Sequence, residues 1–308
     1  MPRRFLAVLA GTLLAGTACR GNGNGYSAAE AAELSVRAQR LTQKLAAASA
    51  DSALGEPLAR WILPPTMAEV SGLALLDSTR LLAHNDETAR IAVVDFRRGV
   101  VLNQFSVGET GMRGDFEGIA VAGDRIFLVA SNGTLYEFAP GEEGERVRYA
   151  EHDTRLGKEC EFEGVAHDSA TASLLLACKR VLKGDESRLV IYRWDIGRRA
   201  LVPEPVISIP VEEVIGANPW DALRPSDITV DPATGHYVLV AAQQRALIEL
   251  TPGGEVVQTR PLPDAHPQAE GVAVTGDGIL LVSDEASNSA GTITLYRWPA
   301  RTSTRGTP

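Results

Sequence analysis

The sequence predicts an all-β fold, namely a β-propeller of about five four-stranded blades that is preceded by a short N-terminal helix. Six blades are the alternative number. One motif returns five times along the 308 residues at nearly equal spacing. Each return is followed by apolar stretches of strand length, and 29 glycines and 17 prolines supply many turns. Units of roughly 40–50 residues with four short strands are typical of propeller blades.

The repeated motif is a small or acidic residue, then glycine or aspartate, then an apolar–small–apolar stretch. Its second position falls at residues 72, 118, 164, 227 and 271, which gives spacings of 46, 46, 63 and 44 residues. The long spacing needs an insertion, which we expect at residues 183–188 or 211–224. A two-sheet sandwich is the alternative fold, but it does not explain five returns of one motif.

Closure of the ring is predicted from the two ends of this repetitive region. The fifth unit stops after its third strand, and residues 60–63 could supply the missing fourth. Such closure leaves no open sheet edge and gives five blades. A sixth blade would need part of the long gap to form its own sheet. The predicted propeller spans residues 59–302, and residues 303–308 are a predicted disordered tail.

Residues 1–19 have the pattern of a bacterial signal peptide. Arg3 and Arg4 precede an apolar run that is too short to cross a bilayer core of about 30 Å. Small residues then lead to Cys19, as in a lipoprotein lipobox, although Gly16 stands where that pattern prefers leucine. We expect lipidation of Cys19 and attachment to a membrane of the bacterial cell envelope, facing the periplasm or the exterior. A plain secreted protein is the alternative.

Residues 20–58 are predicted to hold a glycine-rich leash and a helix from about residue 28 to 48. Ser27 and Glu30 have the spacing of a capping box that opens this helix. Leu34, Leu41 and Leu45 form a narrow apolar stripe on it. We expect a spacer helix that separates the propeller from the membrane, and a packing or dimerising helix is the alternative.

Charge and cysteine content narrow the possible partners. The net charge is −9 and no block of five basic residues occurs, so we expect no nucleic-acid partner.

Cys160 and Cys178 flank a predicted hairpin, and an exported protein meets an oxidising compartment. We therefore expect a disulfide between them, with two buried free thiols as the alternative. We expect the propeller to be monomeric.

Candidate site residues gather where the first strands of the blades begin and the second strands end, because these points share one mouth of the central channel. The first-strand starts carry Ser71, Glu117, Glu163, Ser226 and Glu270, and the second-strand ends carry Asp86, Lys179, Gln243, Asp284 and Glu285. Oxygen ligands suit Ca²⁺, so Glu117, Glu163 and Glu270 are candidate metal ligands and the other residues candidate ligand-binding residues. Alternatively, these side chains lock the blades together by accepting backbone hydrogen bonds.

No enzyme class follows from the remaining motifs. The sequence contains neither a Gly-x-Ser-x-Gly elbow nor a phosphate-binding Gly-x-x-x-x-Gly-Lys-Ser/Thr loop. His84 precedes two polar residues and could act as a base, but a lone histidine at a strand end is more often solvated. Asp227 and Asp231 lie near proline and are expected in turns.

Several short stretches, taken together and in order, resemble the SdiA-regulated family of exported bacterial β-propellers. They are residues 69–73, 85–87, 116–120, 162–166, 225–228 and 270–273. The resemblance covers about residues 60–300 and implies no settled reaction. The lipobox-like start, the spacer helix and the lack of an asymmetric catalytic set favour a membrane-anchored propeller that binds a ligand or an exported protein at the channel mouth. The Glu-Gly motifs also look like those of phytase-like and lactonase-like propellers, which implies the alternative of a Ca²⁺-dependent hydrolase.

Overall fold

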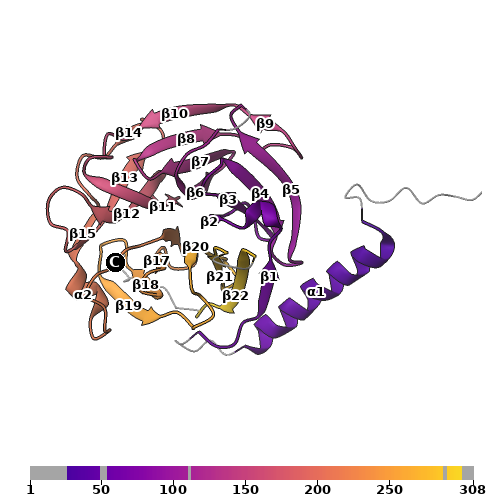
Figure 1. Ribbon diagram of the computed structural model, residues 1–308. Coiled ribbons are helices and arrows are strands. Elements are labelled where there is room, and N and C mark those ends of the chain that lie inside the picture. The colour runs from indigo at the N-terminus through magenta and orange to yellow at the C-terminus, as the bar shows by residue number, and fades with distance from the viewer. Residues whose placement is uncertain (1–25, 49–53, 110–111, 287–289, 300–308) are drawn as a thin grey trace, which may run out of the picture.

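The computed structural model describes residues 26–48, 54–109, 112–286 and 290–299. Within these residues the chain forms a ring of five sheets around a central axis, with one long helix at its rim (Figure 1). The predicted β-propeller is confirmed, and its blades number five. The predicted signal peptide, Cys19, the glycine-rich leash and the tail at 303–308 lie outside the described residues.

Each blade is a small sheet built mainly from strands that follow one another in the chain, and the blades are as follows. Blade 1 contains β2 (Val70–Leu75), β3 (Arg80–Asn85), β4 (Arg90–Asp95), β5 (Val100–Val107) and β9 (Arg146–Val147). Blade 2 contains β6 (Phe116–Ala122), β7 (Arg125–Ala130), β8 (Thr134–Phe138) and β10 (Tyr149–Asp153). Blade 3 contains β11 (Cys160–Asp168), β12 (Ser173–Val181), β13 (Arg188–Asp195), β14 (Ala200–Leu201) and β15 (Ile207–Pro210). Blade 4 contains β16 (Asp227–Val230), β17 (Tyr237–Ala241), β18 (Ala246–Leu250) and β19 (Val256–Pro261). Blade 5 contains β20 (Ala269–Val274), β21 (Ile279–Asp284), β22 (Thr292–Arg297) and β1 (Ala59–Ile62).

The two ends of the repetitive region close the ring as predicted. Strand β1 pairs antiparallel with β22, and Trp61 lies opposite Ile293. The indole Nε1 of Trp61 also donates a hydrogen bond of 2.9 Å to the carbonyl of Phe96, directly after β4. The outermost strand of blade 5 is thereby fastened to blade 1.

The long spacing between the third and fourth motifs is filled without a sixth blade in the described residues. The short strands β14 and β15 both pair with β13. Helix α2 (Val211–Ile215) and an irregular segment then lead into β16, in the second of the two regions predicted for the insertion.

The hydrophobic core lies between neighbouring blades. Phe105 of blade 1 and Phe116 of blade 2 are each 1% exposed and belong to one packed cluster. Phe127 of blade 2 meets Trp194 of blade 3 edge to face, with ring centroids 6.0 Å apart. Burying one such side chain contributes about 1.5–3 kcal/mol, so the blade interfaces stabilise the ring as a whole.

Helix α1 (Ala28–Ala47) begins with the predicted capping box, in which Ser27 and Glu30 exchange hydrogen bonds. Leu41 is 2% exposed and packs with Leu58 and Leu63 beside blades 1 and 5. The burial of Leu41 against the propeller agrees with the packing alternative for this helix. No helix in the described parts of the chain is long and apolar enough to cross a membrane.

Candidate ligand-binding site at the channel mouth

The glycines of the repeated motif allow the innermost strands to converge on the axis. A Cβ added to Gly118 would lie 2.7 Å from the backbone nitrogen of Val165 in the next blade. A Cβ added to Gly164 would lie 2.8 Å from the Cα of Asp227, again one blade further on. Real Cβ atoms do not approach other backbone atoms so closely, so the motif requires glycine where these strands meet.

Asp227 takes the glycine position in blade 4 and closes the axis. It is fully buried on β16, so the prediction of a turn residue was wrong. Its Oδ2 accepts hydrogen bonds from the backbone nitrogens of Val272, at 2.9 Å, and Leu73, at 3.5 Å. Burial raises the pKa of this carboxyl well above its usual value. The neighbours of Asp227 line different cavities, Ser226 at the channel mouth and Ile228 towards the opposite end, so Asp227 lies between the two.

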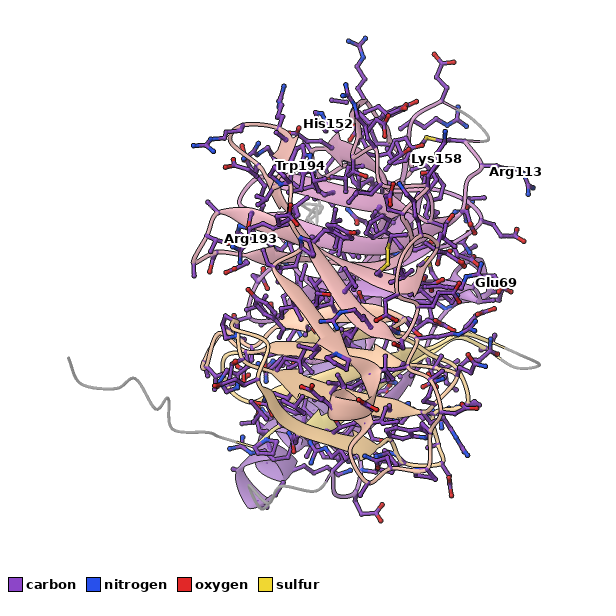
Figure 2. All side chains as sticks on the ribbon, turned by 90° about the vertical axis from the view of Figure 1, so that its left-hand side faces the viewer. Glu69, Arg113, His152, Lys158, Arg193 and Trp194 are labelled. Atoms are coloured by element: carbon purple, nitrogen blue, oxygen red, sulfur yellow. A yellow bond between two sulfur atoms is a disulfide. The ribbon has the colours of Figure 1, made fainter. Side chains whose placement is uncertain are left out.

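Most of the predicted site residues meet in one cavity of about 180 Å³ at the channel mouth. We call it the acidic cavity, and its lining consists of Glu69, Val70, Ser71, Asp86, Glu117, Glu163, Lys179, Glu270 and Glu285. Viewed edge-on, Glu69 lies towards one face of the ring together with Arg113 and Lys158, whereas Arg193 lies towards the other (Figure 2).

A second cavity of about 400 Å³ adjoins the first, since both are lined by Lys179 and Glu270. We call it the basic cavity, and its other lining residues are Arg224, Ser226, Ala242, Gln243, Arg245, Pro267 and Gln268. It contains the predicted residues Ser226 and Gln243. Glu69, Arg224, Arg245 and Gln268 were missed by the sequence analysis because they stand outside the repeated motif positions.

The acidic cavity has far more negative than positive groups. The ammonium of Lys179 forms an ion pair with Glu163. Burial opposes the charge of Lys179, but Glu163 and neighbouring carboxylates outweigh burial and raise its pKa. Burial, reinforced by Glu163 and Asp115, raises the pKa of Glu117 to about 9. One positive charge therefore does not neutralise this group of carboxyls.

Other carboxyls in the acidic cavity also have raised pKa values. A hydrogen bond with Glu69, together with burial, raises the pKa of Glu285 to about 8. Burial raises the pKa of Glu163 to about 7, although Lys179 acts in the opposite direction. Burial likewise raises the pKa of Glu270 and of Asp86. Near neutral pH the cavity is thus filled partly with carboxylic acids and can exchange protons for a bound cation.

Three of the predicted polar residues at the channel mouth form hydrogen bonds that stabilise the surrounding strands and loops. Ser71 Oγ donates to the carbonyl of Glu117 at 3.3 Å, and Ser226 Oγ accepts from the backbone nitrogen of Ala242 at 2.9 Å. Asp284 does not line either cavity, and its Oδ2 is 2.7 Å from Nδ1 of His266. Of these contacts, that of Ser71 joins two blades, as the blade-locking alternative requires, although Ser71 donates rather than accepts. Those of Ser226 and Asp284 join neighbouring segments of blade 4 and of blade 5.

His84 is a structural residue in this arrangement. It is fully buried, so the expectation of a solvated side chain was wrong. Its Nε2 accepts a hydrogen bond of 2.9 Å from the backbone nitrogen of Gly72. Burial lowers its pKa to about 4, so the ring stays neutral and holds the start of β2 in place.

The three predicted calcium ligands line the same cavity, but Lys179 lies among them. Its ammonium pairs with Glu163, one of the predicted ligands, and so supplies the positive charge itself. In the described residues no group of three or more His, Cys, Asp or Glu side chains is arranged to hold a metal ion. Glu117, Glu163 and Glu270 thus share one cavity with a competing ammonium group.

The predicted disulfide is confirmed and braces the ion pair. Cys160 on β11 is bonded to Cys178 on β12, with their Cα atoms 5.7 Å apart. Lys179 directly follows Cys178, and Glu163 lies three residues after Cys160. The pairing of β11 with β12 is irregular between Phe162 and Gly164, so the bond secures both strands beside an irregular segment.

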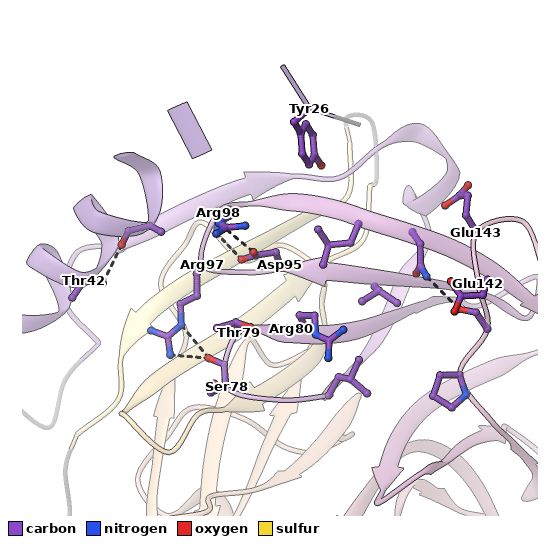
Figure 3. A pocket seen from close by; sticks show the side chains of 17 residues that line it. Tyr26, Thr42, Ser78, Thr79, Arg80, Asp95, Arg97, Arg98, Glu142 and Glu143 are labelled. Carbon is purple, nitrogen blue, oxygen red and sulfur yellow. Dashed lines mark hydrogen bonds and ion pairs between the residues drawn. The ribbon is translucent and has the colours of Figure 1, made fainter. Parts of the chain in front are cut away.

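A larger cavity of about 1170 Å³ lies away from the channel mouth, between α1 and the outer strands of blade 1 (Figure 3). Its arginines are already held by carboxylates. Arg80 pairs with Asp77 at 2.7 Å and Arg98 with Asp95 at 3.6 Å. Arg97 likewise pairs with a carboxylate, so the three arginines that line this cavity each have an acidic partner.

The comparisons with known proteins agree with this architecture. Residues 213–304 match the model of the SdiA-regulated family. This match covers blade 4 and most of blade 5, and it confirms the resemblance to the SdiA-regulated family over that segment. None of the curated protein sequences compared with the chain matches it.

Several solved structures match this chain at low sequence identity. Glutaminyl cyclase from Myxococcus xanthus is 13% identical, with 78% of this chain and 94% of that chain covered and a TM-score of 0.52. A luciferin-regenerating enzyme is 11% identical (80% and 99% covered, TM-score 0.49). The PQQ-bound aldose sugar dehydrogenase from Streptomyces coelicolor is 13% identical (78% and 98% covered, TM-score 0.47). The match to the cyclase shows a likeness of fold alone.

Proposed function

We propose that this protein is an exported β-propeller, anchored in a membrane by lipid on Cys19, that binds a ligand or a protein partner at the channel mouth. The observation that carries the proposal is the acidic cavity, where six carboxyls surround the single ammonium of Lys179. Burying so many like charges costs stability, and such groups of perturbed pKa values cluster at functional sites.

Ligand binding is tested by a thermal-shift screen of amines, amino acids, sugars and phosphate esters. Hits should raise the melting temperature of the wild type but not that of Glu163→Gln or Lys179→Met. The matched control is Asp124→Asn, which removes an exposed carboxylate from the turn between β6 and β7 at the opposite end of the strands. Compounds that still raise the melting temperature of both Glu163→Gln and Lys179→Met would bind outside the channel mouth, which would contradict the proposal.

Membrane anchoring is tested on the full-length chain expressed in a bacterium that processes lipoproteins. The wild type should fractionate with membranes and incorporate radiolabelled palmitate, since each buried acyl methylene contributes about 0.8 kcal/mol of membrane affinity. Cys19→Ala should abolish the label and move the protein to the soluble fraction. Equal labelling of the two proteins would overturn the anchor.

A Ca²⁺-dependent hydrolase of phosphoesters or lactones is the second proposal. The shared cavity of Glu117, Glu163 and Glu270 favours it, and the ion pair of Lys179 opposes it. Calorimetric titration with CaCl₂ decides the matter. Uptake of one ion that is lost in Glu117→Gln would support the hydrolase, and no heat of binding at millimolar Ca²⁺ would remove it.

A further inference from the structure

The two cavities at the channel mouth have opposite charge and share a boundary. Six carboxyls and one ammonium line the acidic cavity, whereas Lys179, Arg224 and Arg245 face the single carboxyl of Glu270 in the basic cavity. Arg245 forms an ion pair with Asp264, an exposed residue outside the lining. Lys179 and Glu270, which line both cavities, mark the boundary between the two fields.

A buried carboxylate outside the lining, that of Asp284, adds to the negative potential of the acidic cavity. Asp284 is 3% exposed, and its Oδ1 has no hydrogen-bond partner within the described part of the protein. Its charge helps to raise the pKa of Glu270. A buried carboxylate oxygen without a donor is costly, and the negative potential of Asp284 at Glu270 favours an added cation there.

We propose that the ligand is a small zwitterion, with an ammonium group in the acidic cavity and an anionic carboxylate in the basic cavity. This inference rests on the proposed binding function and names the class of ligand. The ammonium group would replace protons now held by Glu117 and Glu285. The carboxylate would lie near Arg224 and the amide of Gln243, where a guanidinium can form two parallel hydrogen bonds to it.

The volumes of the cavities agree with this class. A pocket of about 180 Å³ accommodates an aminoalkyl group, and the adjoining 400 Å³ leaves room for a carboxylate and a short side chain. Small-ligand sites commonly occupy about 300–1,000 Å³ and use a few polar groups to fix orientation. A ligand with only one charged group would leave one of the two fields uncompensated.

The test is a ladder of ω-amino acids that vary the separation of the two charges. Calorimetry on the wild-type chain compares 3-aminopropanoate, 5-aminopentanoate and 8-aminooctanoate with the alkylamine and the alkyl carboxylate of each length. At least one ω-amino acid should bind ten times more tightly than its amine and its acid. Its binding should release protons, measured as a dependence of the heat on the buffer's ionisation enthalpy.

Two variants test separately the binding of the ligand's carboxylate and the binding of its ammonium group. Arg224→Gln should reduce the advantage of the ω-amino acid over its amine at least tenfold and leave the amine's affinity unchanged. Glu117→Gln should weaken both compounds, and Asp124→Asn neither. Amines that bind as tightly as ω-amino acids at every length would overturn the zwitterion and leave a binding site for cations. If no member of the ladder binds, the inference fails, while hits of another class in the wider screen would still uphold the proposed function.

Discussion

Glu117 is a residue whose chemistry differs between the folded and the unfolded chain. Its pKa is about 9 in the fold, against 4.5 for the ordinary carboxyl. Between these values the folded protein binds more protons than the unfolded chain, so its stability falls as pH rises through that window. Below pH 4.5 the group is protonated in both states and has no such effect.

Glu117→Gln should therefore remove part of the pH dependence of stability. We expect the variant to be more stable than the wild type at pH 8 by on the order of 2 kcal/mol, and to differ little at pH 5. Urea unfolding between pH 5 and pH 9 measures this difference. Parallel pH profiles for the two proteins would show that Glu117 is not held in its acid form.

At the level of single elements, the hairpin of β11 and β12 depends on its disulfide. The bond joins residues 18 positions apart, and closing such a loop contributes about 3 kcal/mol in the chain-entropy model. Cys160→Ser with Cys178→Ser should lower the free energy of unfolding by this amount. The same double variant should weaken ligand binding, because the strands that carry Glu163 and Lys179 lose their brace. Wild-type protein treated with reductant should match it.

Helix α1 is held to the rim by very few side chains, and Leu41 is the most deeply buried of them. Leu41→Ala should cost about 2–4 kcal/mol of docking free energy, since it removes a packed side chain. Hydrogen exchange should accelerate in α1 and not in the inner strands β2, β6 and β11. Val36→Ala is the control, because Val36 is 49% exposed on the same helix. Faster exchange throughout all blades would mean that the helix stabilises the whole ring.

At the scale of the whole molecule, one side chain joins the first and last blades across the closure. Trp61 bonds to the carbonyl of Phe96 and covers Gly99, where an added Cβ would lie 2.3 Å from the indole ring. Trp61→Ala should lower the unfolding free energy by about 2 kcal/mol, because the side chain is half-buried. Denaturant unfolding measures the loss. A loss below about 0.5 kcal/mol, the usual range for surface substitutions, would show that the β1–β22 ladder suffices.

The propeller could be predicted from the sequence because its motif repeats. Repetition at regular spacing reveals a periodic structure even when each copy of the motif is too short to be informative alone. The sequence predicted the closure, the disulfide and the gathering of Glu117, Glu163 and Glu270 at one mouth. It could not show that α1 docks, because the partners of Leu41 come from the distant blades. It missed the role of Asp227, since a proline nearby suggests a turn, whereas the inward direction of its side chain depends on the packing of three blades.

The pairing of β1 with β22 also determines when folding can finish. Among the strands of the described residues, β1 is synthesised first, and its partner β22, whose register joins Ala59 to Leu295, is synthesised last. Contacts this distant in sequence slow folding, because a very long loop must close before they form. The nascent chain therefore carries β1 without its partner strand until nearly the whole propeller has emerged. Any partner that binds exposed strands has that interval in which to protect it.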